Sequence, residues 1–370
     1  MRVIALILFL VGLWGAPAAA QTIEEKQKAV LVFDIRMDML YTSELGKQMK
    51  FAENMTKQNA QAAQMTGQKP GPDADKMERI FGAMSAPKNM EEIKALQGGG
   101  PLPFEFFARA QYKDATSAKL ALESALDGTE EKIEKDGRTL YKMTAGNGIP
   151  EGMLAHMFND KTIEIGTEAY IYHKNREVFS DNLKASWAKA PNEAVRLAMD
   201  LAGAQELVAE LIKEGKANSP DPTIEPFLDL VDNIKDMGVS VDLTQTNLLT
   251  LRANGIDTEN AEELKSGMDS LLFLAKNGGK QGLMMLKGAG PNGEGDEIAG
   301  VMGKILDSLN AKMSGTDVTV TIPRPKGFES AFEKATQLIP MMIMGGMGGA
   351  PPGGDGSGGL IPPPPPGRGR

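Results

Sequence analysis

The 370-residue sequence contains no cysteine. This absence excludes disulfide bonds, thiol nucleophiles, zinc–thiolate sites and iron–sulfur clusters. Aromatic residues make up only 5% of the chain, which argues against polysaccharide processing, because that chemistry needs aromatic platforms beside paired carboxylates. The two histidines, His156 and His173, are not near any Gly-x-Ser-x-Gly sequence, and each is interpreted as an ordinary surface or half-buried residue. We therefore expect a protein that is not an enzyme and has no cofactor, catalytic site or metal site.

The charge of the chain is acidic, with a formal net charge of -9 at pH 7. Lysines such as Lys184 and Lys189 stand singly, so no basic cluster locally reverses this balance. An acidic surface argues against general affinity for nucleic acid or for anionic lipid headgroups. The glycine-rich stretches beginning at Gly98 and Gly288 lack the Lys-Ser/Thr of a phosphate-binding loop. We expect no nucleic-acid or nucleotide partner.

The first twenty residues have the pattern of a signal peptide. A short positive start, "MR", precedes the apolar run "VIALILFLVGLWG", which is too short to span a bilayer comfortably. Ala18 and Ala20 then form the small-x-small pattern that signal peptidase recognises. We expect cleavage after Ala20, a secreted or periplasmic protein and no transmembrane segment after cleavage. Retention of residues 1–20 as a membrane anchor is the alternative.

The opposite end of the chain, residues 344–370, consists mainly of glycine and proline. With little to bury, such a segment cannot offset the entropy lost on ordering, so we expect it to be disordered. Pro362 to Pro366 favour a polyproline II rod. Two interpretations remain: a tag that recruits a protein partner or envelope component, and a stiff solvated tail.

Two stretches of the sequence look like copies of each other, Arg109–Ala118 ("RAQYKDATSA") and Arg252–Ala261 ("RANGIDTENA"). Each follows a segment of alternating apolar and polar residues, which predicts a half-buried strand with its arginine facing outward. Asp114 and Asp257 are each placed to cap a following helix. We interpret the two arginines as partners of Glu or Asp across neighbouring strands rather than as active-site residues.

The similarity between the two halves extends beyond these stretches. Each half has the order strand, helix, strand, strand, helix, hairpin, and the matched hairpins turn at Asp136-Gly137 and at Ser314-Gly315. A strand at Thr162 to Gly166 has no clear partner in this scheme. We predict an α+β fold of two related units, residues 21–190 and 191–343, each an antiparallel sheet with helices packed on one face, arising from an internal duplication. The units could pack side by side, or their sheets could join.

Three motifs of the second half carry a family resemblance: "DLVDNI" from Asp229, "VSVDL" from Val239 and "DTENAEEL" from Asp257. Together with the order of elements shared by the two halves, these motifs resemble a group of uncharacterised exported bacterial proteins with two tandem α+β units. The resemblance covers roughly residues 25 to 325. It implies the fold and the compartment, and it implies no activity.

Methionine is abundant, at 23 residues. The clusters at 37–39, 153–157 and 341–347 suit adaptable packing, an apolar ligand or Cu(I). The segment "PNGEGDE", residues 291–297, places Asn292, Glu294 and Asp296 at alternate positions, as either a weak calcium site or a flexible loop. The function we predict is an exported non-enzymatic binding or scaffold protein of the bacterial cell envelope. The alternative is a soluble carrier of a lipid-like or other apolar ligand.

Overall fold

The fold is known from a computed structural model. It describes residues 29–67, 69–85, 104–126, 131–143, 152–172, 179–190, 193–202, 230–243, 247–288 and 293–335. The predicted signal peptide, the Gly/Pro-rich tail, His173 and residues 204–215, where the first helix of the second half falls in the predicted order, lie outside these residues. No helix in the described ranges is both long enough and apolar enough to cross a membrane.

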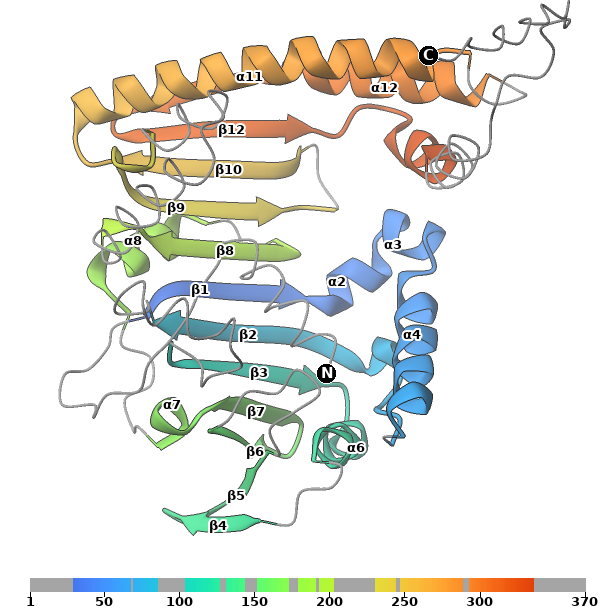
Figure 1. The fold of residues 1–370 in the computed structure, drawn as a ribbon, viewed down its shortest axis with the longest axis vertical. Helices are drawn as coiled ribbons and strands as arrows, with labels where there is room; N and C mark the ends of the chain where they lie inside the picture. Colours follow the sequence, from blue (N-terminus) through green and yellow to red (C-terminus); the bar gives the residue numbers. More distant parts are fainter. Residues whose placement is uncertain are drawn as a thin grey trace, which may run out of the picture.

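The described strands form a single twelve-stranded sheet in the order β11-β12-β10-β9-β8-β1-β2-β3-β7-β6-β5-β4 (Figure 1). Every neighbouring pair is antiparallel. The two halves therefore share one sheet, and they meet where β1 pairs with β8. The strands are β1 Ala29–Arg36, β2 Met77–Ser85, β3 Phe106–Tyr112, β4 Lys132–Lys135, β5 Arg138–Lys142, β6 Met153–Asn159, β7 Thr162–Thr167, β8 Val195–Asp200, β9 Ile234–Val241, β10 Asn247–Gly255, β11 Ala311–Ser314 and β12 Asp317–Pro323.

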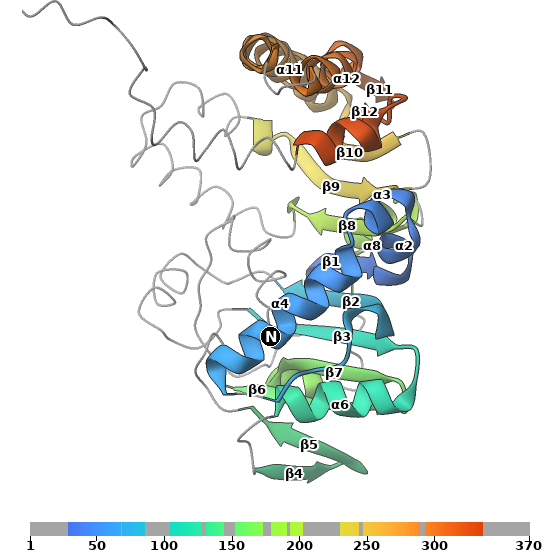
Figure 2. The same cartoon turned by 90° about the vertical axis from the view of Figure 1, so that its right-hand side faces the viewer.

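Both faces of the sheet carry helices, because one core cluster includes α6 and another, on the opposite side, includes α7 and α8. Figure 2 shows α6 alongside β7, with α11 and α12 together at the top. The helices are α2 Met37–Thr42, α3 Glu44–Gln48, α4 Phe51–Thr66, the 3-10 helix η1 Ala74–Lys76, α6 Ala115–Ala125, α7 Glu168–Tyr172, α8 Asp181–Lys189, α11 Thr258–Leu286 and α12 Glu294–Ser308. A further helical stretch covers residues 328–335.

One face, which we call the α6–α11 face, holds most of the core. Successive residues of a strand point to opposite sides, so Phe33 and Ile35 of β1 lie on this face with Phe106 of β3 and Ile165 of β7. Leu122 of α6 packs against them. In the second half the same face is covered by α11, whose buried residues contact the apolar residues of β10, β11 and β12. Each fully buried aliphatic or aromatic side chain contributes about 1.5–3 kcal/mol to the driving force for folding.

Gly82 of β2 allows close packing on the α6–α11 face. A Cβ atom at this position would lie 2.4 Å from the ring of Phe33 and 2.5 Å from the carbonyl oxygen of Phe107. Only glycine leaves space for that ring beside the strand.

The opposite side of the sheet, which we call the α7–α8 face, is also covered by helices. Tyr170 of α7 and Leu183 of α8 are buried against Val32, Ala83 and Phe107. The expectation that the helices pack on one face only is therefore wrong. The reason is that β1, β2, β3 and β8 present apolar residues to both sides of the sheet, and each side must be shielded from water.

The strand-cap-helix stretches have the predicted local structure. Asp114 accepts a hydrogen bond from the backbone N–H of Ser117 at 2.7 Å, and Asp257 accepts one from Asn260 at 2.9 Å. These bonds satisfy donors at the starts of α6 and α11 that have no partner within the helix. Both capping predictions are confirmed.

The predicted match between the two hairpins is wrong. In the second half the β11–β12 hairpin pairs directly with β10, whereas in the first half the strand beside β3 is β7, Thr162–Thr167. The strand for which the sequence indicated no partner thus pairs with both β3 and β6. The β4–β5 hairpin lies beyond β6 at the sheet edge. Its turn at Asp136-Gly137 is nevertheless as expected, with φ of 50° and 72°.

Two helices occupy most of the glycine-rich segment 277–297 that the structure describes. α11 continues to Leu286, and α12 begins at Glu294, so the expectation of a flexible loop at residues 291–297 is wrong for its second half. The two helices pack side by side at the top of Figure 1, where Lys280 forms an ion pair with Asp307 at 2.7 Å. Glu294 and Asp296 lie in the first turn of α12, and Asn292 lies outside the described residues.

Candidate binding groove on helix α11

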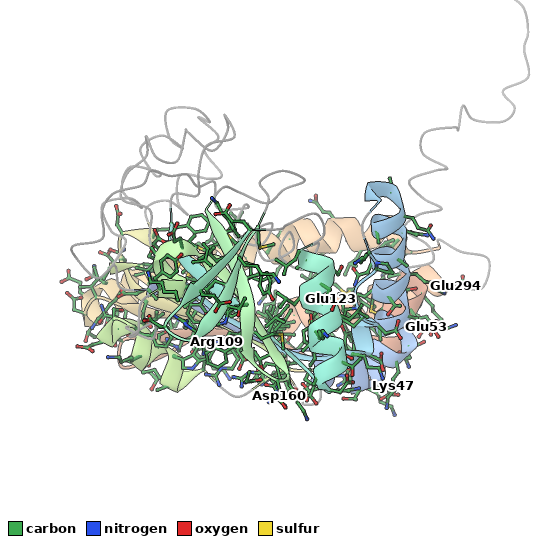
Figure 3. The ribbon with its side chains drawn as sticks, turned by 90° about the horizontal axis from the view of Figure 1, so that it is seen from below. Lys47, Glu53, Arg109, Glu123, Asp160 and Glu294 are labelled. Atoms are coloured by element: carbon green, nitrogen blue, oxygen red, sulfur yellow. The ribbon has the colours of Figure 1, made fainter. Side chains whose placement is uncertain are left out.

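The two repeated arginines are held in ion pairs on the α7–α8 face. Arg109 on β3 lies opposite Glu164 on β7, with its Nε 2.7 Å from Oε2 of the carboxylate. Arg252 on β10 contacts Asp236 on β9 at 2.6 Å and Asp317 on β12 at 2.7 Å. The prediction that both arginines pair with acids across strands is confirmed. Figure 3 views the sheet from its β4 end and labels Arg109 there.

His156 differs from the expectation of a surface or half-buried residue, because it is 1% exposed. Its Nε2 lies 3.2 Å from Oε1 of Glu164, and its Nδ1 lies 2.9 Å from the carbonyl oxygen of Met157. Burial alone raises the pKa of Glu164, but the hydrogen bonds from His156 and Arg109 outweigh burial and lower that pKa overall. The buried Arg–Glu–His row joins β3, β7 and β6, and we assign it a structural role.

The methionine clusters that the structure describes belong to the core. Met37 and Met153 are buried, and Met157 packs against the same apolar cluster. The cluster at residues 341–347 lies outside the described residues. Within the described ranges, no group of three or more His, Asp or Glu side chains is placed to hold a metal ion.

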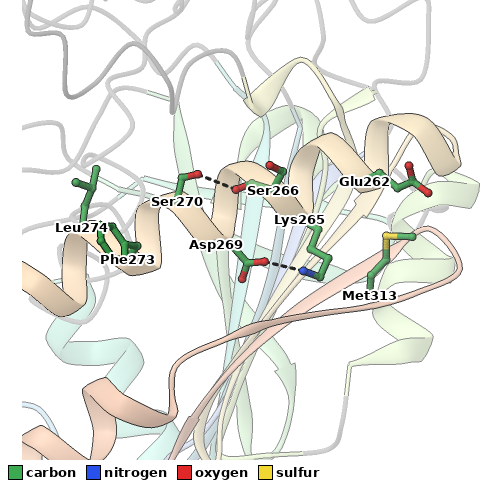
Figure 4. A pocket seen from close by; sticks show the side chains of 8 residues that line it. All are labelled: Glu262, Lys265, Ser266, Asp269, Ser270, Phe273, Leu274 and Met313. Carbon is green, nitrogen blue, oxygen red and sulfur yellow. Dashed lines mark hydrogen bonds and ion pairs between the residues drawn. The ribbon is translucent and has the colours of Figure 1, made fainter.

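A surface groove lies between the outer side of α11 and the edge strand β11. Figure 4 shows Met313 of β11 beneath the helix near Glu262, with Phe273 and Leu274 further along α11. The groove has a volume of about 890 Å³. Its lining residues are Glu262, Lys265, Ser266, Asp269, Ser270, Phe273, Leu274 and Met313.

The apolar part of the groove is open to solvent. Phe273 is 63% exposed and Leu274 is 58% exposed, which is unusual for large apolar side chains in the middle of a helix. α11 buries Leu264 and Ala261 on its other side, against Val318 of β12. A helix that packs through one stripe cannot bury both sides, so these residues stay in water unless a ligand or partner covers them.

The polar part of the groove is asymmetric. Lys265 binds Asp269 at 2.6 Å, and this pairing is the main reason for the lowered pKa of Asp269. Asp269 also accepts a hydrogen bond from the backbone N–H of Ala311 at 3.2 Å, which ties α11 to β11. Glu262 is exposed, and no ion pair or hydrogen bond joins it to the part of the chain that the structure describes. One end of the groove is therefore acidic and the other end is apolar.

Sequence reasoning did not identify this groove. The signal that could have found it is the run of five consecutive apolar residues, "LLFLA", from Leu271 to Ala275. Such a run exceeds the width of one buried stripe on a helix, so some of its members must face solvent. The contribution of Met313, 39 residues beyond Leu274, had no sequence signal of this kind.

Comparisons with known proteins give a distant structural likeness. No family model matches the sequence, and no curated protein matches it. Among solved structures, crystal form IV of TP0453 is similar to the chain with a TM-score of 0.37 and 10% identity, over 83% of this chain and 92% of that one. Crystal form III gives 0.34 and 9%, over 84% and 95% of the two chains, and crystal form I gives 0.34 and 11%, over 84% and 94%.

Proposed function

We propose that this chain is an exported, non-enzymatic binding or scaffold protein of the bacterial cell envelope that engages its partner through the groove on α11. The observation that carries the proposal is the exposure of Phe273 and Leu274 at one end of a groove that Met313 also lines. Large apolar groups that remain in water on an otherwise acidic chain indicate a surface that is covered in the functional state. Export is supported by the leader pattern of residues 1–20.

The non-enzymatic assignment is supported by the roles of the residues that would otherwise be candidates for catalysis. Arg109, Glu164 and His156 bind one another inside the sheet. Arg252 is held by Asp236 and Asp317. A general acid or base must reach the proton of a bound substrate, and buried residues committed to each other are poorly placed for that task.

The internal duplication is part of the same proposal. It is supported by the matching pairing of β1-β2-β3 and β8-β9-β10, which extend in opposite directions from the central β1–β8 contact. It is also supported by the equivalent ion pairs of Arg109 and Arg252, each with a strand that follows its helix. Under this proposal β6–β7, rather than β4–β5, corresponds to β11–β12.

The alternative function, carriage of a lipid-like molecule, is favoured by the apolar lining that Phe273, Leu274 and Met313 provide. Against it, the space between α6 and the sheet is filled by side chains such as Met153 and Ile163. Native mass spectrometry of protein purified from the exporting cell separates the two functions. A stoichiometric extra mass of lipid size supports the carrier.

The proposed function is tested in bacteria that express the full chain with its own N-terminus. Fractionation and N-terminal sequencing should place the protein outside the cytoplasm with cleavage after Ala20. A photo-crosslinking amino acid at Phe273 should then give a discrete cross-linked species that the same probe at Met302 does not give. Met302, on α12, is also exposed and lies outside the groove. Retention in the cytoplasm, or identical cross-linking at both positions, would refute the proposal.

A further inference from the structure

The backbone of β11 is open on the side that borders the groove. β11 is at the end of the strand order, so β12 is its only strand neighbour in the described sheet. Ser314 and Asp317 flank a two-residue turn, so their backbones are hydrogen-bonded to each other. Along an antiparallel hairpin, hydrogen-bonded pairs alternate with pairs that are not hydrogen-bonded, and Met313 and Ala311 belong to the second kind. Ala311 and Met313 therefore direct their N–H and C=O groups away from β12.

One of these outward groups already has a partner, which confirms the orientation. The N–H of Ala311 donates to Asp269 of α11 at 3.2 Å. The outward N–H and C=O of Met313 and the C=O of Ala311 form no bond to β12. A sheet edge of this kind is a template for an additional strand. Here the edge runs beside an apolar groove, which is the combination that peptide-binding domains use when they bind a ligand by strand addition.

We propose that the groove binds a short extended peptide of a partner protein as an added strand on β11, with a basic residue at its Glu262 end and apolar residues at its Phe273 end. This inference rests on the proposed function and specifies its ligand class. The carboxylate of Glu262, which has no ion-pair partner among the described residues, supplies the charge complementarity. The other two charged residues of the groove, Lys265 and Asp269, neutralise each other. The exposed Phe273 and Leu274 supply apolar surface against which alternate side chains of the peptide can pack.

The dimensions of the groove fix the length of the peptide. Glu262 and Leu274 are twelve helical residues apart, which corresponds to about 18 Å along α11. An extended chain advances about 3.3 Å per residue, so about five or six peptide residues fill this length. Backbone hydrogen bonds to Met313 anchor one end of the peptide, and contact with Leu274 anchors the other.

The test measures fluorescence anisotropy with fluorescein-labelled octapeptides of alternating Val and Thr that carry two Lys residues at one end or the other. We expect one of the two peptides to bind the full chain. N-methylation of every second amide of that peptide should weaken binding at least tenfold, because it removes the hydrogen bonds to β11. Methylated peptides can be made with either of the two alternate sets of amides blocked. If both bind as tightly as the unmethylated peptide, strand addition is wrong. It is also wrong if neither Lys peptide binds.

Matched variants locate the site. Leu274→Ser should weaken binding at least tenfold, whereas Met284→Ser should leave it unchanged, because Met284 is also exposed on the same helix, at 69% against 58% for Leu274, but lies outside the groove. Glu262→Lys should weaken binding of the Lys peptide and improve binding of its Glu counterpart. Glu259→Lys, in the same helical turn but outside the lining, is the control. Equal effects within either pair would refute the site.

Two further outcomes separate this inference from its competitors and from the proposed function. If the peptide binds only after deletion of residues 336–370, the groove is occupied by the chain's own C-terminal segment and a partner peptide is refuted. If binding competes with self-association in sedimentation experiments, a second copy of the chain occupies the groove, and a partner peptide is likewise refuted. Specific cross-linking at Phe273 in exporting cells without peptide binding would leave the proposed function intact and refute strand addition.

Discussion

Arg109 and Glu164 face each other across β3 and β7, with Nε of the guanidinium 2.7 Å from Oε2 of a carboxylate that is 0% exposed. The guanidinium carbon of Arg109 also lies 4.9 Å from the ring centroid of Phe107 and 4.0 Å from that of Phe158. The second carboxylate oxygen of Glu164, Oε1, lies 3.2 Å from Nε2 of His156. A buried carboxylate costs free energy unless such partners compensate for the lost water, so the pair and the histidine depend on one another.

Replacement of Glu164 should show this dependence. Glu164→Gln keeps the shape of the side chain but removes the charge that Arg109 and His156 share, and removing one partner of a buried pair costs about 3–5 kcal/mol. We expect a loss of this size in the free energy of unfolding at pH 7, measured by urea denaturation. The control is Glu131→Gln, which breaks the solvent-exposed pair between Lys142 and Glu131 and should cost less than about 1 kcal/mol. Similar losses in both variants would contradict the compensation argument.

The pH dependence of the same residue gives a second prediction. The pKa of Glu164 is lower in the folded protein than in an unfolded chain, where a glutamate titrates near about 4.3. The stabilisation by this carboxylate is thus fully present above the unfolded pKa and is lost as the pH falls through the folded pKa. The difference in unfolding free energy between wild type and Glu164→Gln should shrink as the pH falls below about 4.3. A difference that stays constant down to pH 3 would refute the prediction.

The local features of this region were predictable from sequence because they depend on short-range patterns. Alternation placed Arg109 and Arg252 on the polar side of their strands, and Asp114 and Asp257 stood one position before their helices. The pairing of β7 with β3 was not predictable in the same way. Alternation specifies which face a strand buries, but it does not specify which of two hairpins closes against β3.

The length of α11 and the position of the groove are further features that could not be predicted from the sequence. Gly278, Gly279 and Gly282 disfavour a helix by about 1 kcal/mol each relative to alanine, so their local preference indicates a loop. Packing overrides that preference, since Gly279 is where Leu306 of α12 approaches the backbone. The run of apolar residues indicated that some of them, such as Phe273, would be exposed. The groove that Phe273 shares with Met313 depends on contacts between distant segments.

In the second half, the two ion pairs of Asp317 should differ in strength. Asp317 binds Arg252 at 2.7 Å and Lys189 of α8 at 2.7 Å, but Arg252 is 12% exposed whereas Lys189 is 44% exposed. Water screens the exposed pair. A double-mutant cycle should therefore give a coupling energy above about 1 kcal/mol for Arg252 with Asp317 and below about 1 kcal/mol for Lys189 with Asp317. Equal couplings would show that exposure does not control these interactions.

Glu193 offers a prediction of opposite sign. Burial raises its pKa, a hydrogen bond with Ser240 opposes this, and the nearby carboxylate of Asp242 raises the pKa further. The folded protein therefore binds this proton more tightly than the unfolded chain does. The favourable contribution is present below the unfolded pKa and is lost as the pH rises through the folded pKa. Glu193→Gln should raise the melting temperature at pH 8 and have little effect at pH 4. A lower melting temperature at pH 8 would contradict this prediction, and Glu262→Gln at the exposed groove is the control.

Two glycine replacements should change stability in opposite directions. Gly82→Ala adds a methyl group 2.4 Å from the ring of Phe33 and 2.5 Å from the backbone carbonyl oxygen of Phe107. The ring can move only by disturbing the core, and the carbonyl belongs to the sheet, so we expect a loss of about 1–3 kcal/mol. Gly300→Ala, within α12, meets no atom within 4 Å, and alanine reduces the conformational freedom of the unfolded chain. This variant should gain about 0.4–1 kcal/mol. Urea denaturation of the full chain measures both changes in the free energy of unfolding. If Gly82→Ala left that free energy unchanged, β2 and β3 would not be packed as closely as the pairing of Gly82 with Ala108 requires.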